Sequence, residues 1–218
     1  MLSVVIPTLN AAPTLQACVD ALGPVDELVV ADGGSGDGTA AIAEAAGARV
    51  VQAPRGRGLQ LAAGAEAARG DWLLFLHADT RLSAGWKAEA EAHVRRAPSN
   101  AACFRFRLDD AAWQARAIER GVALRVRLLA LPYGDQGLLI SRRLYEEVGG
   151  YRPLPLMEDV DLVRRIGYRR LKVMKSSALT SAARWRRDGW ARRSGRNLLC
   201  LALYRSGLSA ERVARLYG

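Results

Sequence analysis

Two side chains that can act as metal ligands or acid–base groups, His77 and Asp79, follow directly after an apolar run at positions 72–76. Five consecutive apolar residues are typical of a strand that is buried on both faces, as in a parallel sheet. Ligands of open α/β sheets bind at the carboxyl ends of the strands, so His77 and Asp79 are placed to contact a cation or a phosphate. An ordinary turn that begins with an aspartate explains the same residues equally well.

Polar residues also follow other predicted strands and loops. Asp32 ends a strand at 27–31 and begins an eight-residue segment with four glycines, whose freedom at positive φ lets the backbone approach a ligand closely. Arg57 lies between two glycines where a helix starts, an arrangement that suits an anionic group. With Asp79 as an oxygen ligand for Mg²⁺ or Mn²⁺, these segments predict a pocket for a nucleotide diphosphate. The predicted nucleotide contacts are Pro7, Thr8, Asn10, Asp32, Gly33, Gly34, Arg57, Gly58, His77 and Ala78.

The glycine pattern does not fit two common phosphate-binding motifs. In a dinucleotide fingerprint counted from Gly34 and Gly36, the third glycine would stand where the chain has Thr39. The acidic residue that should end the next strand is also missing from segment 48–52, and the chain has no Walker sequence. Both classes of nucleotide-binding protein are therefore disfavoured.

A second pair of carboxylates, Glu158 and Asp159, opens a predicted helix that ends near Arg170. The positive end of a helix stabilises an ionised carboxylate, which suits a general base. Ordinary acidic residues in the first turn of a helix give the same pattern. Without the other sites, this simpler interpretation is the favoured one.

The net charge of the 218-residue chain is +10, and it is unevenly distributed. Residues 164–218 hold 15 Arg or Lys against Asp188 and Glu211, whereas residues 1–163 have a net charge of −3. A basic segment of this kind suits nucleic acid, anionic lipid headgroups or a phosphorylated substrate. A solvated arginine-rich surface is the alternative, and it explains individual arginines better than it explains the whole asymmetry.

The remaining composition indicates a globular protein. Half of the residues are hydrophobic, no apolar run approaches the roughly 20 residues of a membrane-spanning helix, and no signal-like basic segment precedes the first strand. Cys18, Cys103 and Cys200 lack metal-ligand spacing and are expected to be reduced, buried thiols. We therefore expect a cytoplasmic protein, with peripheral attachment to the inner membrane face as an option.

The polar segments occur in an order that resembles a known family. Segments 3–10 (SVVIPTLN), 32–39 (DGGSGDGT), 56–58 (GRG) and 70–79 (GDWLLFLHAD) are similar to family 2 glycosyltransferases of the glycosyltransferase A fold. Segments 134–137 (GDQG), 149–151 (GGY) and 158–159 (ED) extend the resemblance to about residue 165. The sequences LHADT (76–80), PYGDQ (132–136) and MEDV (157–160) resemble the radical-SAM/selenodomain-associated subgroup of that family.

The resemblance implies an inverting transfer of a sugar from a nucleotide-diphosphate donor to a hydroxyl or phosphate acceptor. It implies that Asp32 holds the base or ribose, that Asp79 holds a divalent cation, and that Asp159 is the general base. Glu158 is expected beside it, as a second catalytic residue or as a contact to acceptor hydroxyls. The implied partners are a nucleotide-sugar donor and a small-molecule or lipid-linked acceptor. The predicted acceptor contacts are Tyr133, Asp135, Gln136, Arg184 and Trp185.

Two positions depart from the family pattern. His77 replaces the first carboxylate of the Asp-x-Asp metal motif, which leaves one carboxylate and one imidazole. Segment 181–185 keeps only Arg184 and Trp185 from the Gln-x-x-Arg-Trp motif of processive members, so processive polymerisation is not expected. Acceptor contacts, or a core tryptophan beside a surface arginine, explain this pair equally well.

Alternating strands and helices predict a doubly wound, mostly parallel sheet flanked by helices, with right-handed crossovers. Later strands are expected at 101–108, 137–140, 171–174 and 178–181, and residues 109–131 are expected to form one long helix or two helices broken near Gly121. We assign residues 1–181 to an α/β domain that binds donor and acceptor. Residues 182–218 are expected to form a basic helical extension packed on that domain, with helices at 188–205 and 209–217.

Two other functional classes remain open. A nucleotidyltransferase on a related fold needs a glycine-rich loop with a basic residue after the first strand, where this chain has the sequence PTLN. A membrane- or anion-binding protein would use the basic extension, although a helix docked on the core explains the same segment better. The apolar residues that would lie on an anionic bilayer are Leu198, Leu199, Leu201, Leu203 and Tyr204. No recognised nucleic-acid motif is present, so no specific nucleic-acid partner is expected.

Overall fold

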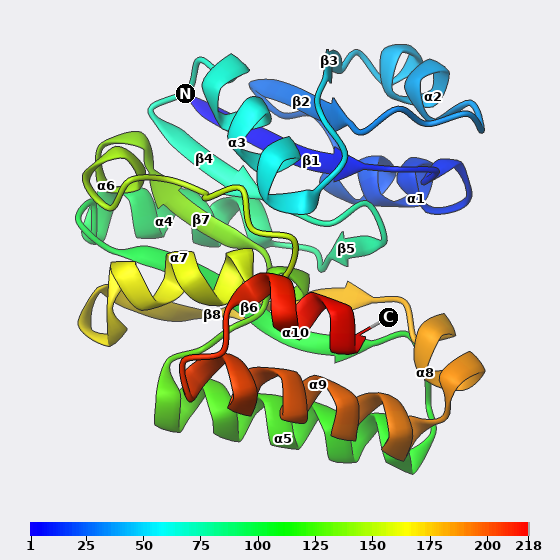
Figure 1. Ribbon diagram of the computed structural model, residues 1–218. Coiled ribbons are helices and arrows are strands. Elements are labelled where there is room, and N and C mark those ends of the chain that lie inside the picture. Colours follow the sequence, from blue (N-terminus) through cyan, green and yellow to red (C-terminus); the bar gives the residue numbers. More distant parts are fainter. Residues whose placement is uncertain (218) are drawn as a thin grey trace.

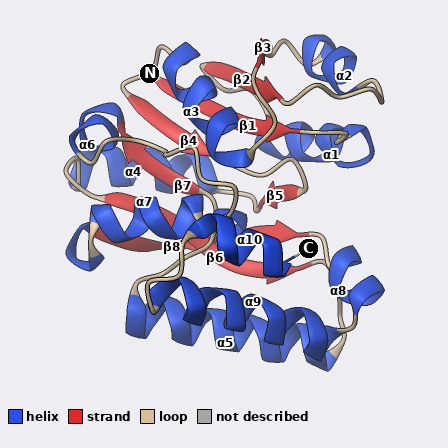
Figure 2. Cartoon of the chain, in the orientation of Figure 1, coloured by secondary structure: helices blue, strands red, loops and turns tan. Residues whose placement is uncertain are grey.

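The computed structural model describes residues 1–217, in which eight strands form one sheet with helices on both faces (Figures 1 and 2). The strands are β1 (Leu2–Thr8), β2 (Glu27–Asp32), β3 (Arg49–Gln52), β4 (Trp72–Phe75), β5 (Thr80–Leu82), β6 (Ala101–Leu108), β7 (Leu138–Ser141) and β8 (Leu171–Thr180). Their order is β3-β2-β1-β4-β7-β6-β8-β5. β3, β2, β1 and β4 are parallel, β7 is antiparallel to both of its neighbours, and β5 is antiparallel to β8. The mostly parallel α/β sheet predicted from the sequence is confirmed.

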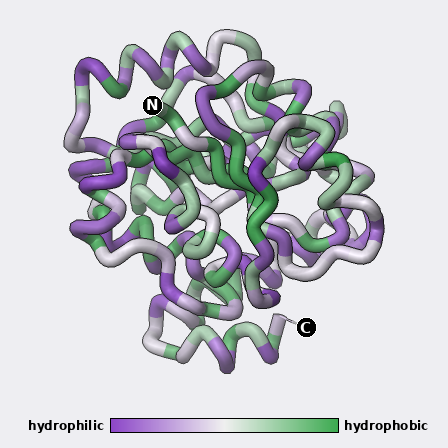
Figure 3. The backbone as a smooth tube through the Cα atoms, turned by 90° about the horizontal axis from the view of Figure 1, so that it is seen from above, coloured by the Kyte–Doolittle hydropathy of each residue, from purple (hydrophilic) through white to green (hydrophobic). Residues whose placement is uncertain are grey.

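Two hydrophobic clusters cover the two faces of this sheet. The helices are α1 (Ala12–Leu22), α2 (Thr39–Ala45), α3 (Arg57–Ala67), α4 (Trp86–Arg96), α5 (Trp113–Leu129), α6 (Arg142–Glu147), α7 (Glu158–Ile166), α8 (Ala183–Asp188), α9 (Trp190–Arg205) and α10 (Ala210–Tyr217), with short 3₁₀ turns at Gly134–Gln136 and Tyr168–Arg170. Because successive side chains of a strand point to opposite faces, Val4 and Ile6 pack with α1, α2 and α4, whereas Val5 packs with α3, α6 and α7. Figure 3 shows the apolar strands at the centre of the molecule.

Strands β1 and β4 lie in the middle of the sheet because both faces of their apolar runs must be buried. α3 lies unusually close to them at Gly64, where a Cβ atom would stand 2.4 Å from Cγ1 of Val5. A side chain at this position would push the helix away from the sheet. The sheet and α3 together therefore hold the carboxyl ends of β1, β2 and β4 in fixed positions.

The C-terminal helices pack on the same body as the rest of the chain. Cys200, Leu201 and Val213 join the cluster that contains α7, and Trp185 packs with Phe106 on β6. All three cysteines are buried and free, as expected. None of the described helices has the length and apolar character needed to span a bilayer.

Several local predictions were wrong. Residues 80–82 form a strand that sequence reasoning missed, because three residues give no local signal and the strand is stabilised by pairing with β8 and by packing of Leu82 in the core. The two strands expected at 171–174 and 178–181 are one continuous strand, and the helix of Glu158 ends at Ile166 rather than near Arg170. Of the two alternatives for residues 109–131, the single helix is the one that forms, as α5, with Gly121 inside it.

Polar side chains near three helix starts have different roles. α2 begins after Gly38, which is in a left-handed conformation, and Oδ1 of Asp37 accepts a hydrogen bond from the amide of Thr39, the first residue of the helix, at 3.2 Å. α4 begins after Gly85, and the Ser83 hydroxyl accepts a hydrogen bond from the backbone of β8. Ser141 caps α6, because its hydroxyl accepts a hydrogen bond from the amide of Leu144. Finally, α8 precedes the expected C-terminal helix and was not predicted.

Candidate active site

The carboxyl ends of β1 and β2 are joined by the side chain of Asp32. Its Oδ1 accepts a hydrogen bond from Oγ1 of Thr8 at 2.8 Å, and its Oδ2 accepts from the amides of Ser35 at 2.8 Å and Gly34 at 3.0 Å. Burial opposes ionisation, but these hydrogen bonds and one from the Ser35 hydroxyl lower the pKa of Asp32. Asp32 is 1% exposed, so its carboxylate shapes the glycine-rich loop.

Further polar contacts fix the loop that follows β1. The amide of Asn10 donates to Oγ of Ser35 at 2.8 Å, and Oδ1 of Asn10 accepts from the amide of Gly36 at 3.0 Å. From α3, Nε2 of Gln60 donates to the backbone oxygens of Thr8 and, at 3.1 Å, Ala31. Sequence reasoning did not single out Ser35 or Gln60; the only hint was a hydroxyl residue within the glycine-rich segment.

His77 and Asp79 lie in the turn between β4 and β5. A Cβ atom at Gly134 would stand 2.6 Å from Nε2 of His77, so the close approach of this loop to the imidazole requires glycine. Burial, together with the positive charges of Arg57 and Arg184, holds the pKa of His77 well below its usual value. The imidazole is therefore neutral at physiological pH and keeps a lone pair.

Asp159 connects the start of α7 to the loop before β7. Its Oδ2 accepts a hydrogen bond from the amide of Gly134 at 2.6 Å, and its Oδ1 accepts from the amide of Val160 at 2.7 Å. Met157, with φ of 65°, turns the chain into the helix just before these carboxylates. The side chains of Asp159 and His77 both approach the same point of Gly134, since a Cβ atom there would also stand 3.5 Å from Oδ2 of Asp159.

Glu158 forms an ion pair with Arg57, with Oε1 and Nη1 3.2 Å apart. The Glu158 side chain is 1% exposed, whereas that of Arg57 is 40% exposed. Burial and the neighbouring charge of Asp159 raise the pKa of Glu158 to about 7, although Arg57 opposes the shift. At Glu158, burial thus opposes the negative charge that the helix terminus and Arg57 favour.

Tyr133 and Asp135 add polar atoms that lack partners in residues 1–217. The guanidinium of Arg125 lies 3.5 Å from the centre of the Tyr133 ring. The Tyr133 hydroxyl and Oδ1 of Asp135 are buried without a hydrogen-bond partner among the described residues. Burial raises the pKa of Asp135 to about 7; Arg125 opposes this, and Asp159 and Asp79 reinforce it. Such groups are available to a bound ligand.

Two adjoining cavities bring most of the predicted site residues together. A cavity of about 510 Å³ is lined by Pro7, Thr8, Asn10, Arg57, His77, Ala78, Asp79 and Arg184. A second cavity, of about 120 Å³, is lined by Arg57, His77, Asp79, Tyr133, Asp135, Glu158, Asp159, Arg184 and Trp185. Arg57, His77, Asp79 and Arg184 lie at the boundary of both. We call the larger one the donor cavity and the smaller one the acceptor cavity.

Five predicted residues do not line either cavity: Asp32, Gly33, Gly34, Gly58 and Gln136. Gly58 serves helix packing, because a Cβ atom there would lie 2.4 Å from the backbone oxygen of Arg152. Gln136 is 2% exposed, and its Nε2 donates to the backbone oxygen of Phe104 at 3.0 Å. A contact of Asp32 with a base or ribose stays a prediction.

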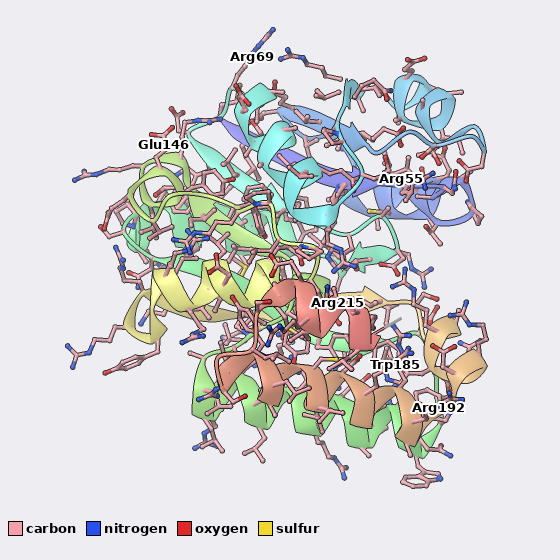
Figure 4. The ribbon with its side chains drawn as sticks, viewed as in Figure 1. Arg55, Arg69, Glu146, Trp185, Arg192 and Arg215 are labelled. Atoms are coloured by element: carbon pink, nitrogen blue, oxygen red, sulfur yellow. The ribbon has the colours of Figure 1, made fainter. Side chains whose placement is uncertain are left out.

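The C-terminal helices contribute cavity residues that sequence reasoning missed: Arg193, Asn197 and Tyr217. No motif marks them, and only the basic character of the segment pointed to this region. Trp185, which Figure 4 labels, belongs to α8 and is 7% exposed, and its Nε1 donates to Oγ of Ser194 on α9 at 3.4 Å. The guanidinium of Arg193 lies 5.2 Å from its ring centre. Trp185 is thus both a core residue and part of the cavity wall, whereas Arg184 is exposed.

Comparison with known proteins decides the family. A model of glycosyl transferase family 2 matches residues 3–149. The chain belongs to glycosyl transferase family 2. The predicted recognition is therefore confirmed at the family level, and the narrower resemblance to the radical-SAM/selenodomain-associated subgroup stays a prediction.

Curated relatives of this family 2 chain match over a limited segment. Glucosyl-3-phosphoglycerate synthase of Mycolicibacterium paratuberculosis is 38% identical over 92 residues, which are 36% of this chain and 28% of that protein. A PGL/p-HBAD biosynthesis glycosyltransferase of Mycobacterium tuberculosis is 40% identical over 93 residues, which are 38% of this chain and 36% of that protein. The chain therefore matches about a third of each relative.

Solved structures are similar over more of the chain. TarS of S. aureus in complex with UDP has a TM-score of 0.64 and 17% identity, and the match covers 83% of this chain and 60% of TarS. Glucosyl-3-phosphoglycerate synthase of Mycobacterium tuberculosis, in complex with Mn²⁺, UDP and phosphoglyceric acid, has a TM-score of 0.61 and 21% identity, with coverage of 95% and 79%. These likenesses confirm the glycosyltransferase A fold.

Proposed function

We propose that the protein transfers a sugar, with inversion, from a nucleotide-diphosphate donor to a hydroxyl or phosphate acceptor, assisted by a divalent cation. The observation that carries this proposal is the junction of the two cavities. Asp79 lies at the boundary of both, and Asp159 lines the acceptor side. A donor phosphate and an acceptor hydroxyl would meet at this boundary.

The donor cavity suits a nucleoside diphosphate. Thr8 and Asn10 line it, and the two arginines at the boundary, Arg57 and Arg184, suit the negative charge of the diphosphate. Partial desolvation lowers the pKa of Arg57, but its acidic neighbours, Glu158 foremost, raise it by more, so it remains a cation. UDP in the solved structures of two similar proteins supports a uridine nucleotide as the donor.

The residues at the boundary fit Mg²⁺ or Mn²⁺. Asp79 offers a carboxylate and His77 a neutral imidazole. No group of three or more acidic, His or Cys side chains that could hold a metal occurs among the described residues. The remaining ligands would therefore be phosphate oxygens and water, which is usual for cations that accompany nucleotides. A bound cation would supply electrostatic stabilisation of the leaving diphosphate.

On the acceptor side, Asp159 is the proposed general base. The amides of Gly134 and Val160 orient its carboxylate. As the acceptor oxygen attacks the anomeric carbon, its proton moves to Asp159, and the nucleoside diphosphate departs from the opposite face of the sugar. This single displacement inverts the anomeric configuration. Glu158 holds Arg57 in place beside the departing phosphates, which makes it a positioning residue.

Two substitutions and one control test the proposal. Asp79→Asn should abolish the Mn²⁺-dependent rise in melting temperature that UDP produces in the wild type. Asp159→Asn should keep that rise and lower sugar transfer by about 10²- to 10⁴-fold. Asp20→Asn, on the exposed side of α1, should change neither measurement.

Two outcomes would count against this assignment. If no nucleoside diphosphate raised the melting temperature with either Mg²⁺ or Mn²⁺, the donor site would be disproved. If the protein released pyrophosphate from a nucleoside triphosphate, a nucleotidyltransferase would be the better description. A cytoplasmic location stays a prediction.

A further inference from the structure

Helix α5 is the outermost layer on one side of the molecule (Figures 1 and 2). Its outer side carries three large apolar side chains that are mostly exposed: Trp113 at 75%, Leu124 at 56% and Leu128 at 68%. Separations of 11 and 4 residues correspond to about three turns and one turn, so these side chains lie along one stripe. A stripe of this kind is unusual on a surface that faces only water.

A groove of about 630 Å³ runs along one flank of α5, between this helix and the strands β6 and β8. Its lining contains five arginines and one glutamate, with a net charge of +4: Arg105, Arg107, Arg116, Arg120, Arg127 and Glu119. Glu119 is paired with Arg107 at 2.6 Å and with Arg116 at 2.7 Å. The other three arginines form no ion pair with any residue in 1–217.

One buried polar atom of the groove lacks a partner. Gln136 lines the groove and is 2% exposed, and its Oε1 accepts no hydrogen bond from the described residues. Its Nε2 is fixed by the backbone oxygen of Phe104. The amide oxygen is therefore available to a hydroxyl of a molecule that lies in the groove.

Helix α9, beside α5 in Figure 1, also combines exposed apolar side chains with basic ones. Leu198 and Leu199 are exposed, and α9 contains no acidic residue. Of the other residues expected on a bilayer, Leu201 is buried, and Leu203 and Tyr204 pack against the core. The favoured interpretation of this segment, a helix docked on the core, therefore holds for these three residues, and only the side of α9 with Leu198 and Leu199 is exposed. The larger apolar stripe lies on α5.

We propose that the α5 face, defined as Trp113, Leu124 and Leu128 with Arg105, Arg120 and Arg127, binds the surface of an anionic phospholipid membrane. The apolar stripe enters the boundary between headgroups and acyl chains, while the arginines contact lipid phosphates. One phosphate-bearing headgroup occupies the groove, with a hydroxyl on Gln136.

Charge disfavours a second copy of the chain as the occupant of this face. In a two-fold symmetric dimer the same patch meets itself. Such an interface would bring the three free arginines of each copy together without any acidic partner. An anionic lipid surface neutralises these charges instead.

A third cavity connects this layer to the proposed active site. About 300 Å³ lie between α5 and α9, lined by apolar residues such as Ile118, Val122 and Leu198. Tyr133, Asp135, Trp185 and Asn197 line both this cavity and the acceptor cavity. An acceptor carried by the membrane would therefore reach Asp159 from the side on which α5 lies.

Vesicle co-sedimentation tests the proposal with the full chain. We expect the wild type to bind phosphatidylcholine vesicles that contain about 30% phosphatidylglycerol at least tenfold more strongly than pure phosphatidylcholine vesicles, and to lose binding at about 0.5 M salt. Arg120→Glu with Arg127→Glu should lower the vesicle partition coefficient at least tenfold, since each arginine near an anionic surface accounts for about a fivefold change.

The matched control is Arg69→Glu with Arg143→Glu, which makes the same change in charge on the exposed surface outside the α5 face. Figure 4 shows Arg69 at the opposite end of the molecule from Arg192 on α9. The control should bind within about twofold of the wild type. Trp113→Ser with Leu128→Ser should reduce vesicle binding. Lowering the salt concentration should not restore that binding, because the lost contacts are apolar.

Three outcomes would overturn the proposal. The wild type could remain in the supernatant with anionic vesicles at low salt, or the two charge-reversal variants could lose binding equally. Analytical ultracentrifugation could also show a dimer that Trp113→Ser with Leu128→Ser converts to a monomer, which would assign the face to a second copy. Hydrolysis of the donor by the same samples checks the proposed catalytic function separately.

Discussion

Replacement of Glu158 by Gln should remove part of the pH dependence of stability. Glu158 is 1% exposed, and burial and Asp159 raise its pKa from 4.5 to about 7. A carboxyl whose pKa is higher in the folded state binds its proton more tightly there. Its contribution to stability is therefore complete below pH 4.5 and is lost as the pH rises to about 7.

The magnitude follows from the shift in pKa. A difference of about 2.5 units corresponds to about 3 kcal/mol in the free energy of unfolding. Glutamine cannot ionise, and its amide oxygen can still accept the hydrogen bond from Arg57. Between pH 4.5 and 7, the wild type should therefore lose about 3 kcal/mol more stability than Glu158→Gln. Because the pKa of Asp135 is also raised to about 7, the stability of both proteins should still fall somewhat as the pH rises.

Urea unfolding at several pH values between 4 and 8 measures this difference. Glu146→Gln, an exposed glutamate on α6 that Figure 4 labels, serves as a matched control and should follow the wild-type curve. The reasoning would be refuted by parallel curves for Glu158→Gln and the wild type. A constant offset between them would report only the lost ion pair, whereas a change in slope reports the titration.

Three further predictions concern the loops and helices around the site. Gly134→Ala should lower sugar transfer at least about tenfold, because its Cβ would stand 2.6 Å from Nε2 of His77 and displace the amide that orients Asp159. Unchanged kinetics would contradict this geometry. Gly121→Ala should raise the free energy of unfolding by up to about 1 kcal/mol, since the position is helical and faces open space. A loss of stability in thermal unfolding would show that the position has no room for a Cβ atom. Arg184→Ala should raise the donor KM by about tenfold or more, as expected for a lost contact with a charged group. It should leave the melting temperature nearly unchanged, because Arg184 forms no ion pair with the described residues. A large fall in melting temperature would instead assign Arg184 a structural role.

Much of the fold and of the candidate site could be predicted because strand ends carry local information. The apolar run at 72–76 can only be buried, and the polar residues that follow it must therefore lie at the edge of the sheet. His77, Asp79 and Arg57 were expected to converge, and they line the same cavities. The three-residue strand β5 could not be predicted, since its stability comes from pairing with β8, about 100 residues away in the chain.

By itself, the sequence determined most of the order of strands and helices, the family, and the chemical groups at the sheet edge, because each depends on neighbouring residues. Only the tertiary structure decided how those groups are used. Asp32 is surrounded by hydrogen-bond donors, Gln136 turns toward the groove beside α5, and Glu158 is buried against Arg57, 101 residues away in the sequence. Burial and hydrogen-bond partners set whether a carboxylate is ionised and free to react, and both arise from segments that meet only when the chain folds.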